Sequence, residues 1–272
     1  MQKLAEGVYS YEALRSAGPE RFTTVSLFVV TPAGVLVADG QGSVAETTKM
    51  IEAIAKVTDR PITHLVIGSD HGDHTAGNSV FPTAITTYVH PASKATLDGG
   101  GRSNAPGPVA ALPGKVEVVS DRTTIALGGR EIHVLFLGRA HTGGDLSVYL
   151  PDEKILFMSE AYLNRIFPAM RSAYPSEWVA TIERAQKLGA DVYVPGHGFV
   201  ETPAILKEEL ETFRQALVTV IGEARRLRAA GLSADAAAKE AKFGDLESWS
   251  LRGSQGATAI RRVYLELEGT LK

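Results

Sequence analysis

The chain has 272 residues, of which 44% are hydrophobic and 22% charged, and it contains no cysteine. Its net charge of −3 and pI near 6.2 argue against a nucleic-acid-binding protein, because phosphate contacts need a concentrated positive surface. Without cysteine there are no disulfides, thiolate ligands or catalytic thiols, so a bound metal has to be held by histidine, carboxylate or water.

Length and hydropathy indicate one domain and no membrane span. No stretch in the middle of the chain resembles a linker, so we predict a single domain over residues 1–272. No apolar run approaches the ~20 residues that a membrane helix needs, and the first residues do not resemble a secretory leader. We therefore expect a soluble protein without nucleic-acid or membrane partners. It would be cytoplasmic as the chain stands, and periplasmic if a leader has been removed.

The first part of the chain predicts a hairpin followed by a βαβ unit. Residues 23–31 and 34–39 are β-rich and are separated by a Pro-Ala-Gly turn. From Ser43, apolar residues fall at helical spacing until an Asp-Arg-Pro run at 59–61 ends the helix. The apolar run 62–68 is typical of a buried strand. In open α/β sheets function lies just beyond the carboxyl end of such a strand, which makes residues 69–74 the first candidate site.

The remainder predicts more strands and then helices. A strand at 85–89 precedes the Gly- and Pro-rich segment 98–113, which we expect to be a long mobile loop. Further strands are predicted at 116–119, 123–127, 131–137, 146–150 and 155–158, the last two as a hairpin. Helices are predicted at 176–188 and 203–230, with a short strand at 191–194 between them.

Four of the seven histidines lie in glycine-containing turns directly after predicted strands. His71 and His74 belong to the run Ser-Asp-His-Gly-Asp-His at 69–74, His141 to a Gly-rich turn at 138–145, and His197 to a Pro-Gly-His-Gly turn. Turn glycines let the backbone aim an imidazole into a cleft. Imidazoles with carboxylates suit a borderline divalent ion such as Zn²⁺. The other histidines, His64, His90 and His133, are interpreted as structural.

These motifs resemble those of the metallo-β-lactamase superfamily, in which a His-x-His-x-Asp-His motif lies between a strand and a helix. His141 falls in the second histidine turn of that family, Glu160 where strand 155–158 would deliver a bridging aspartate, and His197 in its Pro-Gly-His-Gly turn. The resemblance runs in order from about residue 23 to 198. It implies an α/β fold, the metallo-β-lactamase-like αβ/βα four-layer sandwich, with metals at the edge of the two sheets. The implied metal ligands are His71, Asp73, His74, His141, Glu160 and His197.

Two positions depart from the family pattern. Ser69 stands where the first histidine is expected, and Glu160 stands where the bridging aspartate is expected. The first metal group has therefore lost a neutral ligand, and only His71 and His141 remain. The second group is complete, with Asp73, His74 and His197. Glu160 can still reach it, since one methylene moves a carboxylate by only ~1.5 Å. We expect one tight zinc ion and a second that is weaker or absent.

The resemblance implies a metal-dependent hydrolase, in which zinc lowers the pKa of water and polarises a substrate carbonyl. We assign catalytic roles to His71, Asp73 and Ser69; an empty first group would free His71 or His141 to act as a general base. The loop after Glu160 is rich in aromatic and arginine side chains. We expect Tyr162, Arg165 and Arg171 to bind substrate, with Arg165 or Arg171 binding a carboxylate of the substrate. Alternatively, the apolar members of the loop cover the core and the arginines are solvated.

Esters, thioesters, lactones and β-lactams all fit this reading, so the partner is a small-molecule substrate of open class. An iron-dependent dioxygenase of the same superfamily ranks lower, because its iron would occupy the group that Ser69 disrupts. A nucleic-acid phosphodiesterase would need a basic stripe that the chain lacks. A non-catalytic descendant that acts as a binding module is a further alternative. The long helix near the C-terminus is compatible with a monomer or a homodimer.

Overall fold

Two β-sheets form the centre of the computed structural model, which describes residues 1–17, 20–100, 111–200 and 205–271. The first sheet has seven strands in chain order, antiparallel from β1 to β4 and parallel from β4 to β7. They are β1 (Gln2–Ala5), β2 (Val8–Ala17), β3 (Glu20–Thr31), β4 (Gly34–Ala38), β5 (Ile62–Val66), β6 (Thr86–Val89) and β7 (Lys115–Val118).

The second sheet has five strands in the order β12-β11-β10-β9-β8. They are β8 (Arg122–Leu127), β9 (Arg130–Phe136), β10 (Leu146–Leu150), β11 (Ile155–Phe157) and β12 (Val192–Val194). Only β11 and β12 pair in parallel. The crossover between these two strands contains α4 (Pro175–Lys187), as expected for a parallel connection.

Alternation along the strands builds separate cores on the two faces of the first sheet. In β3, Val25, Leu27 and Val29 face the second sheet and join a cluster with residues such as Val134 and Val148. Phe28 points the opposite way, into a cluster with apolar residues of β4, β5 and α1. A period of two residues places neighbours on opposite faces of a strand. One strand therefore contributes to both cores.

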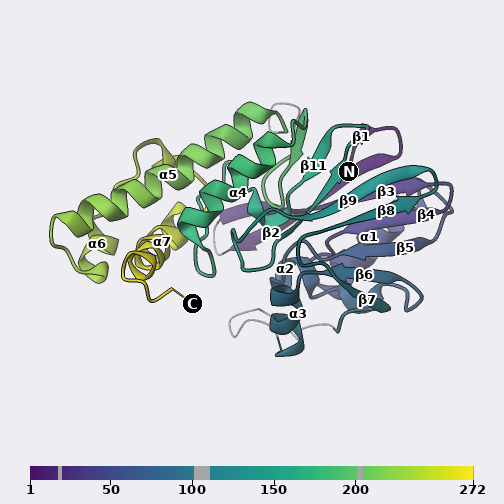
Figure 1. Cartoon of the computed structure of the whole chain (residues 1–272), viewed down its shortest axis with the longest axis horizontal. Coiled ribbons are helices and arrows are strands. Elements are labelled where there is room, and N and C mark those ends of the chain that lie inside the picture. Colours follow the sequence, from purple (N-terminus) through teal and green to yellow (C-terminus); the bar gives the residue numbers. More distant parts are fainter. Residues whose placement is uncertain (18–19, 101–110, 201–204, 272) are drawn as a thin grey trace.

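Helices cover the outer faces, which gives four layers (Figure 1). The first sheet carries α1 (Val44–Ala55), whose Ser43 cap accepts a hydrogen bond from Glu46 N, together with α2 (Gly72–Thr75), η1 (Asn78–Val80) and α3 (Pro91–Asp98). Beyond the second sheet lie α4, α5 (Lys207–Ala229), α6 (Ala234–Glu240) and α7 (Arg252–Leu267), which share one large core with Trp178, Phe213 and Tyr193. The remaining elements are η2 (Ser159–Ala161) and η3 (Gly244–Ser248). The predicted αβ/βα sandwich is confirmed.

Most predicted elements are present within a few residues of their expected bounds. The helix predicted at 203–230 is observed at Lys207–Ala229. Residues 101–110 of the predicted loop at 98–113 lie outside the described residues, and α3 before it was not predicted. The strands β1 and β2 were also missed. In the described ranges, no helix combines the length and apolar character that crossing a bilayer requires.

Candidate metal centre

The six predicted ligands meet where both sheets end. The run after β5 supplies His71, Asp73 and His74; Asp73 and His74 lie in the short helix α2. His141 lies between β9 and β10, Glu160 lies in η2 directly after β11, and His197 follows β12. Their ligand atoms form two groups, each within 4.8 Å. One group is Asp73, His74, Glu160 and His197, and the other is His71, His141 and Glu160.

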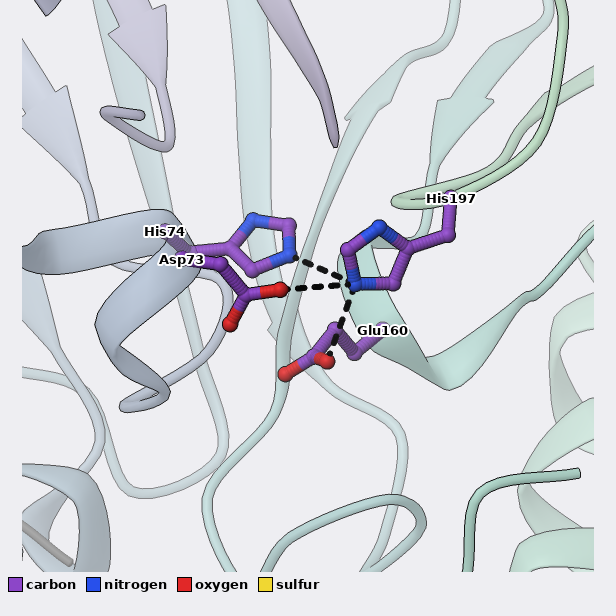
Figure 2. Close-up of side chains that lie close together, drawn as sticks. All are labelled: Asp73, His74, Glu160 and His197. Carbon is purple, nitrogen blue, oxygen red and sulfur yellow. Dashed lines mark hydrogen bonds and ion pairs between the residues drawn. The ribbon is translucent and has the colours of Figure 1, made fainter. Parts of the chain in front are cut away.

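The group of Asp73, His74, Glu160 and His197 is centred on His197 (Figure 2). In keeping with the order used for the family, we call it the second metal group. His197 Nε2 lies 3.2 Å from Asp73 Oδ2, 3.2 Å from Glu160 Oε1 and 3.3 Å from His74 Nε2. All four side chains point toward one another from three separate segments. Such a set of nitrogen and carboxylate donors is what a tetrahedral zinc site requires.

The outer nitrogens of the two imidazoles in the second metal group are supported by the protein. His197 Nδ1 is 2.8 Å from the carbonyl oxygen of Thr23. A carbonyl can only accept, so Nδ1 carries the proton and Nε2 of the neutral ring keeps a lone pair. His74 Nδ1 lies 3.0 Å from Asp39 Oδ2. Asp39 is itself held in place, because its Oδ1 accepts a hydrogen bond of 2.6 Å from Gly68 N.

The other group, the first metal group, lacks this outer support. His71 Nδ1 lies 2.9 Å from Glu160 Oε2, and His141 Nε2 lies 3.1 Å from Glu160 Oε1. Both histidines are buried, but within the described residues His71 Nε2 and His141 Nδ1 have neither a hydrogen-bond nor an ion-pair partner. His74 Nδ1 also makes no hydrogen bond, but it keeps its 3.0 Å ion-pair contact with Asp39. Outer partners fix the orientation of a metal-binding histidine and raise its basicity. The histidines of the first metal group are therefore less firmly oriented for binding a metal than those of the second.

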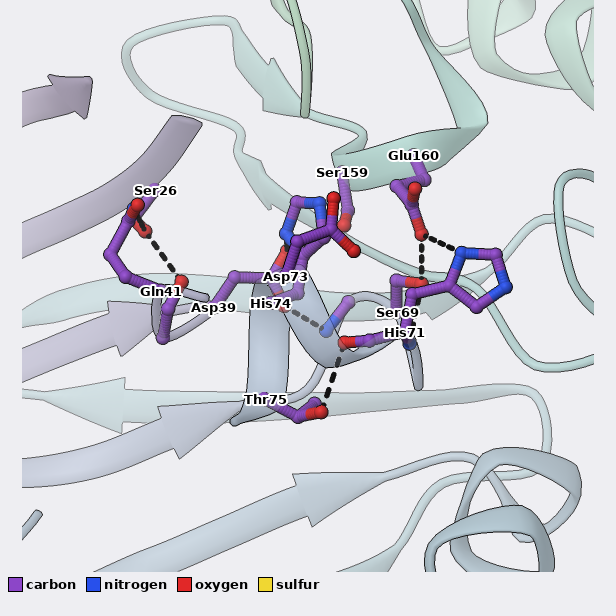
Figure 3. A network of polar contacts seen from close by, with 12 residues as sticks. Ser26, Asp39, Gln41, Ser69, His71, Asp73, His74, Thr75, Ser159 and Glu160 are labelled. Carbon is purple, nitrogen blue, oxygen red and sulfur yellow. Dashed lines mark hydrogen bonds and ion pairs between the residues drawn. The ribbon is translucent and has the colours of Figure 1, made fainter. Parts of the chain in front are cut away.

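Ser69 lies beside Glu160, the residue that the two ligand groups share. Its hydroxyl donates a hydrogen bond to Glu160 Oε2 and accepts one from His71 N at 3.3 Å (Figure 3). Ser69 is completely buried and does not line the cavity above the ligands. The structure therefore places it behind Glu160, which does not favour the catalytic role predicted from the sequence.

The charges at the centre are strongly coupled. Burial alone lowers the pKa of His197, but hydrogen bonds to Asp73 and Glu160 raise it to about 10. Burial raises the pKa of Asp73, but the hydrogen bond and charge interaction with His197 outweigh it and hold the pKa of Asp73 well below its usual value. In His141 the effect of burial prevails and lowers the pKa. Buried carboxylates thus depend on nearby positive charge, which a divalent cation supplies in place of protons. The donor set and its burial fit a metal ion.

A cavity of about 310 Å³ opens over the ligands. Arg171 lines it, as predicted for a substrate-binding residue, and is exposed. Tyr162 does not line it: the side chain is fully buried against Phe213, with ring centroids 5.8 Å apart. Arg165 does not line it either, because its guanidinium forms two 2.8 Å hydrogen bonds with Glu209. For Tyr162 and Arg165 the structure supports the alternative of core packing and a surface ion pair.

Other cavity and support residues were not anticipated. Arg15, Phe22, Leu251 and Gln255 line the cavity from the β2–β3 hairpin and from the segment around the start of α7. They belong to no motif, so the sequence offers no signal for them. Asp39 is different, since it is the last residue of the predicted strand 34–39 and directly follows the observed β4, so the same strand-end rule applies to it.

The three remaining histidines lie outside both ligand groups. His64 lies 2.8 Å from Thr63 Oγ1 and stacks on Tyr88. His90 accepts a hydrogen bond from Ala92 N and so caps α3. His133 lies in β9 beside Glu131. These are local structural contacts, in agreement with their interpretation from the sequence.

A family model described as the metallo-beta-lactamase superfamily matches residues 19–197. Metallo-beta-lactamase type 2 of Bacillus cereus is 24% identical over 216 residues, covering 76% of this chain and 77% of that protein. Subunit alpha of 2,4-dinitroanisole O-demethylase from a Nocardioides species is 24% identical over 140 residues, which span 51% of this chain and only 41% of the subunit. The metallo-beta-lactamase from Pontibacter korlensis superposes with a TM-score of 0.66 at 22% identity, over 80% of this chain and 97% of its own. That likeness shows the shared fold.

Proposed function

Since this chain belongs to the metallo-beta-lactamase superfamily, we propose that it is a zinc-dependent hydrolase acting on the carbonyl of an ester, thioester, lactone or β-lactam. The observation that carries the proposal is the pair of buried ligand groups sharing Glu160 at the floor of a cavity. A non-catalytic module has no need of converging ligands that open onto such a space.

The second metal group would hold the tighter zinc, because its imidazoles are oriented by Thr23 and Asp39. The first metal group would hold a weaker ion. A bound zinc ion supplies Lewis-acid chemistry, lowering the pKa of water and polarising a carbonyl. The chain itself buries and orients the ligands, and both His71 and His141 line the cavity, where either can accept a proton from water if the first group is unfilled.

The cavity walls favour a small substrate with an apolar body and an anionic end. Phe22, Leu163, Ile166 and Leu251 provide apolar lining. Arg171 also lines the cavity, and no ion pair ties it to another residue of the described ranges. An unpaired guanidinium beside an apolar wall is suited to a carboxylate. We propose Arg171 as the substrate anchor.

The test combines zinc content per chain with hydrolysis of nitrocefin, a γ-lactone, a p-nitrophenyl ester and a thioester. We expect at least one tightly bound zinc and a hydrolytic activity that a chelator abolishes. His197→Ala should lose the tight zinc and the activity, because His197 contacts every other member of the second metal group. His133→Ala is the matched control and should retain both.

Unchanged hydrolysis by the His197→Ala protein would show that the second metal group is not catalytic. A wild-type protein without any tight zinc would favour the binding-module alternative over the hydrolase.

A further inference from the structure

The carboxylate of Glu160 serves both ligand groups. Its Oε1 lies 3.2 Å from His197 Nε2 and 3.1 Å from His141 Nε2. Its Oε2 lies 2.9 Å from His71 Nδ1 and accepts the hydrogen bond of Ser69. Three of these four partners are themselves candidate ligands. Ser69 is the one of these four partners that offers neither an imidazole nor a carboxylate donor.

The hydroxyl of Ser69 is engaged as both donor and acceptor by these contacts. Its single O–H donates to Glu160, and its oxygen accepts from the backbone of His71. A neutral hydroxyl is a weak zinc ligand, and the O–H of Ser69 is already committed to a buried carboxylate. Ser69 is therefore placed to act on Glu160 and not on a metal ion.

The backbone brings these two residues together through close approaches at glycines. A Cβ on Gly68 would lie 2.6 Å from Ser159 Cβ, and a Cβ on Gly196 would lie 2.3 Å from the carbonyl carbon of Ser159. Ser159 is thus packed between the ends of β5 and β12, with a positive φ of 46°. The next residue, Glu160, consequently projects into the centre beside Ser69 (Figure 3).

We propose that Ser69 is a positioning residue, which holds Glu160 Oε2 toward His71 so that Glu160 supplies the first metal group with the ligand that Ser69 itself does not provide. A glutamate side chain has several rotatable bonds, and a fixed hydrogen bond restricts it to one useful orientation. The two differences from the family pattern are then related. Glu160 is longer than the expected aspartate, and it extends across the space beside Ser69, which is smaller than the expected histidine. This inference rests on the proposed metal centre.

The test titrates metal-free full-length protein with zinc in competition with a chromophoric chelator. The wild type should bind one zinc tightly and a second more weakly. Ser69→Ala should weaken the second binding step, which fills the first metal group, by about tenfold or more, the usual effect of removing a residue that hydrogen-bonds to a ligand. The first binding step, which fills the second metal group, should stay within about twofold. Ser69→Thr, which keeps the hydroxyl, should restore the second step. Thermal melting of each metal-free variant checks that it is folded.

A double-mutant cycle separates positioning from a general structural effect. In a Glu160→Ala background, Ser69→Ala should have no further effect on either zinc affinity, because the residue through which it acts is gone. Cobalt(II) absorption gives a second readout. Ser69→Ala should change the ligand-field bands of the weaker ion, in the first metal group, but not those of the tighter ion.

Wild-type affinities in Ser69→Ala would overturn the proposal. So would equal losses in the alanine and threonine variants, additive losses in the Glu160→Ala background, or a wild type that binds one zinc at any excess. If the wild type binds no zinc at all, the proposed function fails first and this inference fails with it.

Discussion

Single residues on the outer side of the imidazoles distinguish the two metal groups. Thr23 O and Asp39 contact the outer nitrogens of His197 and His74, whereas His71 and His141 have no such partner among the residues described. These contacts determine which nitrogen keeps a lone pair for the metal. The expectation of one tight and one weaker ion, first based on the loss of a histidine at Ser69, thereby gains a second and independent physical basis.

Arg171 and Arg165 provide a matched pair for testing substrate recognition. Arg171→Gln is expected to lower kcat/KM about 5- to 30-fold for a carboxylate-bearing p-nitrophenyl ester, since a charge-assisted hydrogen bond contributes about 1–2 kcal/mol. A neutral ester should be affected much less. Arg165→Gln should change neither rate, because Arg165 is paired with Glu209 outside the cavity. Equal losses for charged and neutral esters would remove Arg171 as the anchor.

Asp145 gives a prediction about pH. It lies 3% exposed in the turn that carries His141, and burial raises its pKa from 3.8 to about 7, against hydrogen bonds from Thr142. A carboxyl whose folded pKa is raised favours the fold when protonated, so its contribution is complete below pH 3.8 and is lost as the pH rises through about 7. The unfolding free energy of the metal-free protein should therefore fall between about pH 4 and 7 and level off above that range.

Asp145→Asn removes this titration, while its amide can still accept from Thr142 N and donate to Thr142 Oγ1. Urea unfolding at several pH values should show a stability advantage for the variant that increases with pH. Parallel pH profiles for the two proteins would contradict the assignment.

At the scale of single elements, α4 connects the helical layer to the metal centre. Its Trp178 is fully buried, and its indole N–H donates to the Ala161 carbonyl at 2.8 Å. The indole also forms a T-shaped contact with the ring of His141, with ring centroids 5.3 Å apart. One helix residue therefore packs against the segments that carry two ligands, Glu160 and His141. Loss of this packing should be felt at the centre as well as in the core.

We expect Trp178→Ala to destabilise the protein by about 3–5 kcal/mol through a cavity, and Trp178→Phe by about 1–2 kcal/mol through the hydrogen bond that Ala161 loses. Val218→Ala on the exposed side of α5, where the valine is 41% exposed, should change stability by less than about 0.5 kcal/mol. Chemical denaturation measures all three. An alanine variant as stable as the phenylalanine variant would show that the indole is not tightly packed.

At the scale of the whole molecule, the candidate ligands come from segments that are far apart in the chain. Asp73 and His74 follow a strand of the first sheet, whereas Glu160 and His197 follow strands of the second. A metal bound by both sets links the two sheets, and the unfolded chain has no comparable site. Binding energy is then folding energy.

Zinc at about 1,000 times its Kd should stabilise the protein by about 4 kcal/mol, which corresponds to an increase in Tm of roughly 8–16 °C for a chain of this size. Differential scanning calorimetry with zinc and with a chelator measures the shift. The His197→Ala protein should show little or none of it. An equal shift in that variant would indicate zinc binding elsewhere.

The sequence by itself determined the chain order of the main elements and the positions of the candidate ligands, and its resemblance to a known superfamily implied the sandwich. The spacing of apolar residues and the glycine-containing turns are local properties of the chain. The histidine motifs follow the carboxyl ends of predicted strands, where a site is expected. Tyr162 and Arg165 could not be placed in this way, because a loop that starts at a ligand can turn its next side chains into the core or outward, as these two do.

Only the tertiary structure decided which residues complete the site. Asp39 supports the imidazole of His74, 35 positions away, and Thr23 supports that of His197, 174 positions away. Leu251 and Gln255 reach the cavity from near the carboxyl end of the chain. Ser69 appeared from the sequence as a lost ligand, whereas the folded chain places its hydroxyl on Glu160, 91 positions away. Contacts of this kind depend on how two sheets and their helices pack, and no local pattern of residues records that packing.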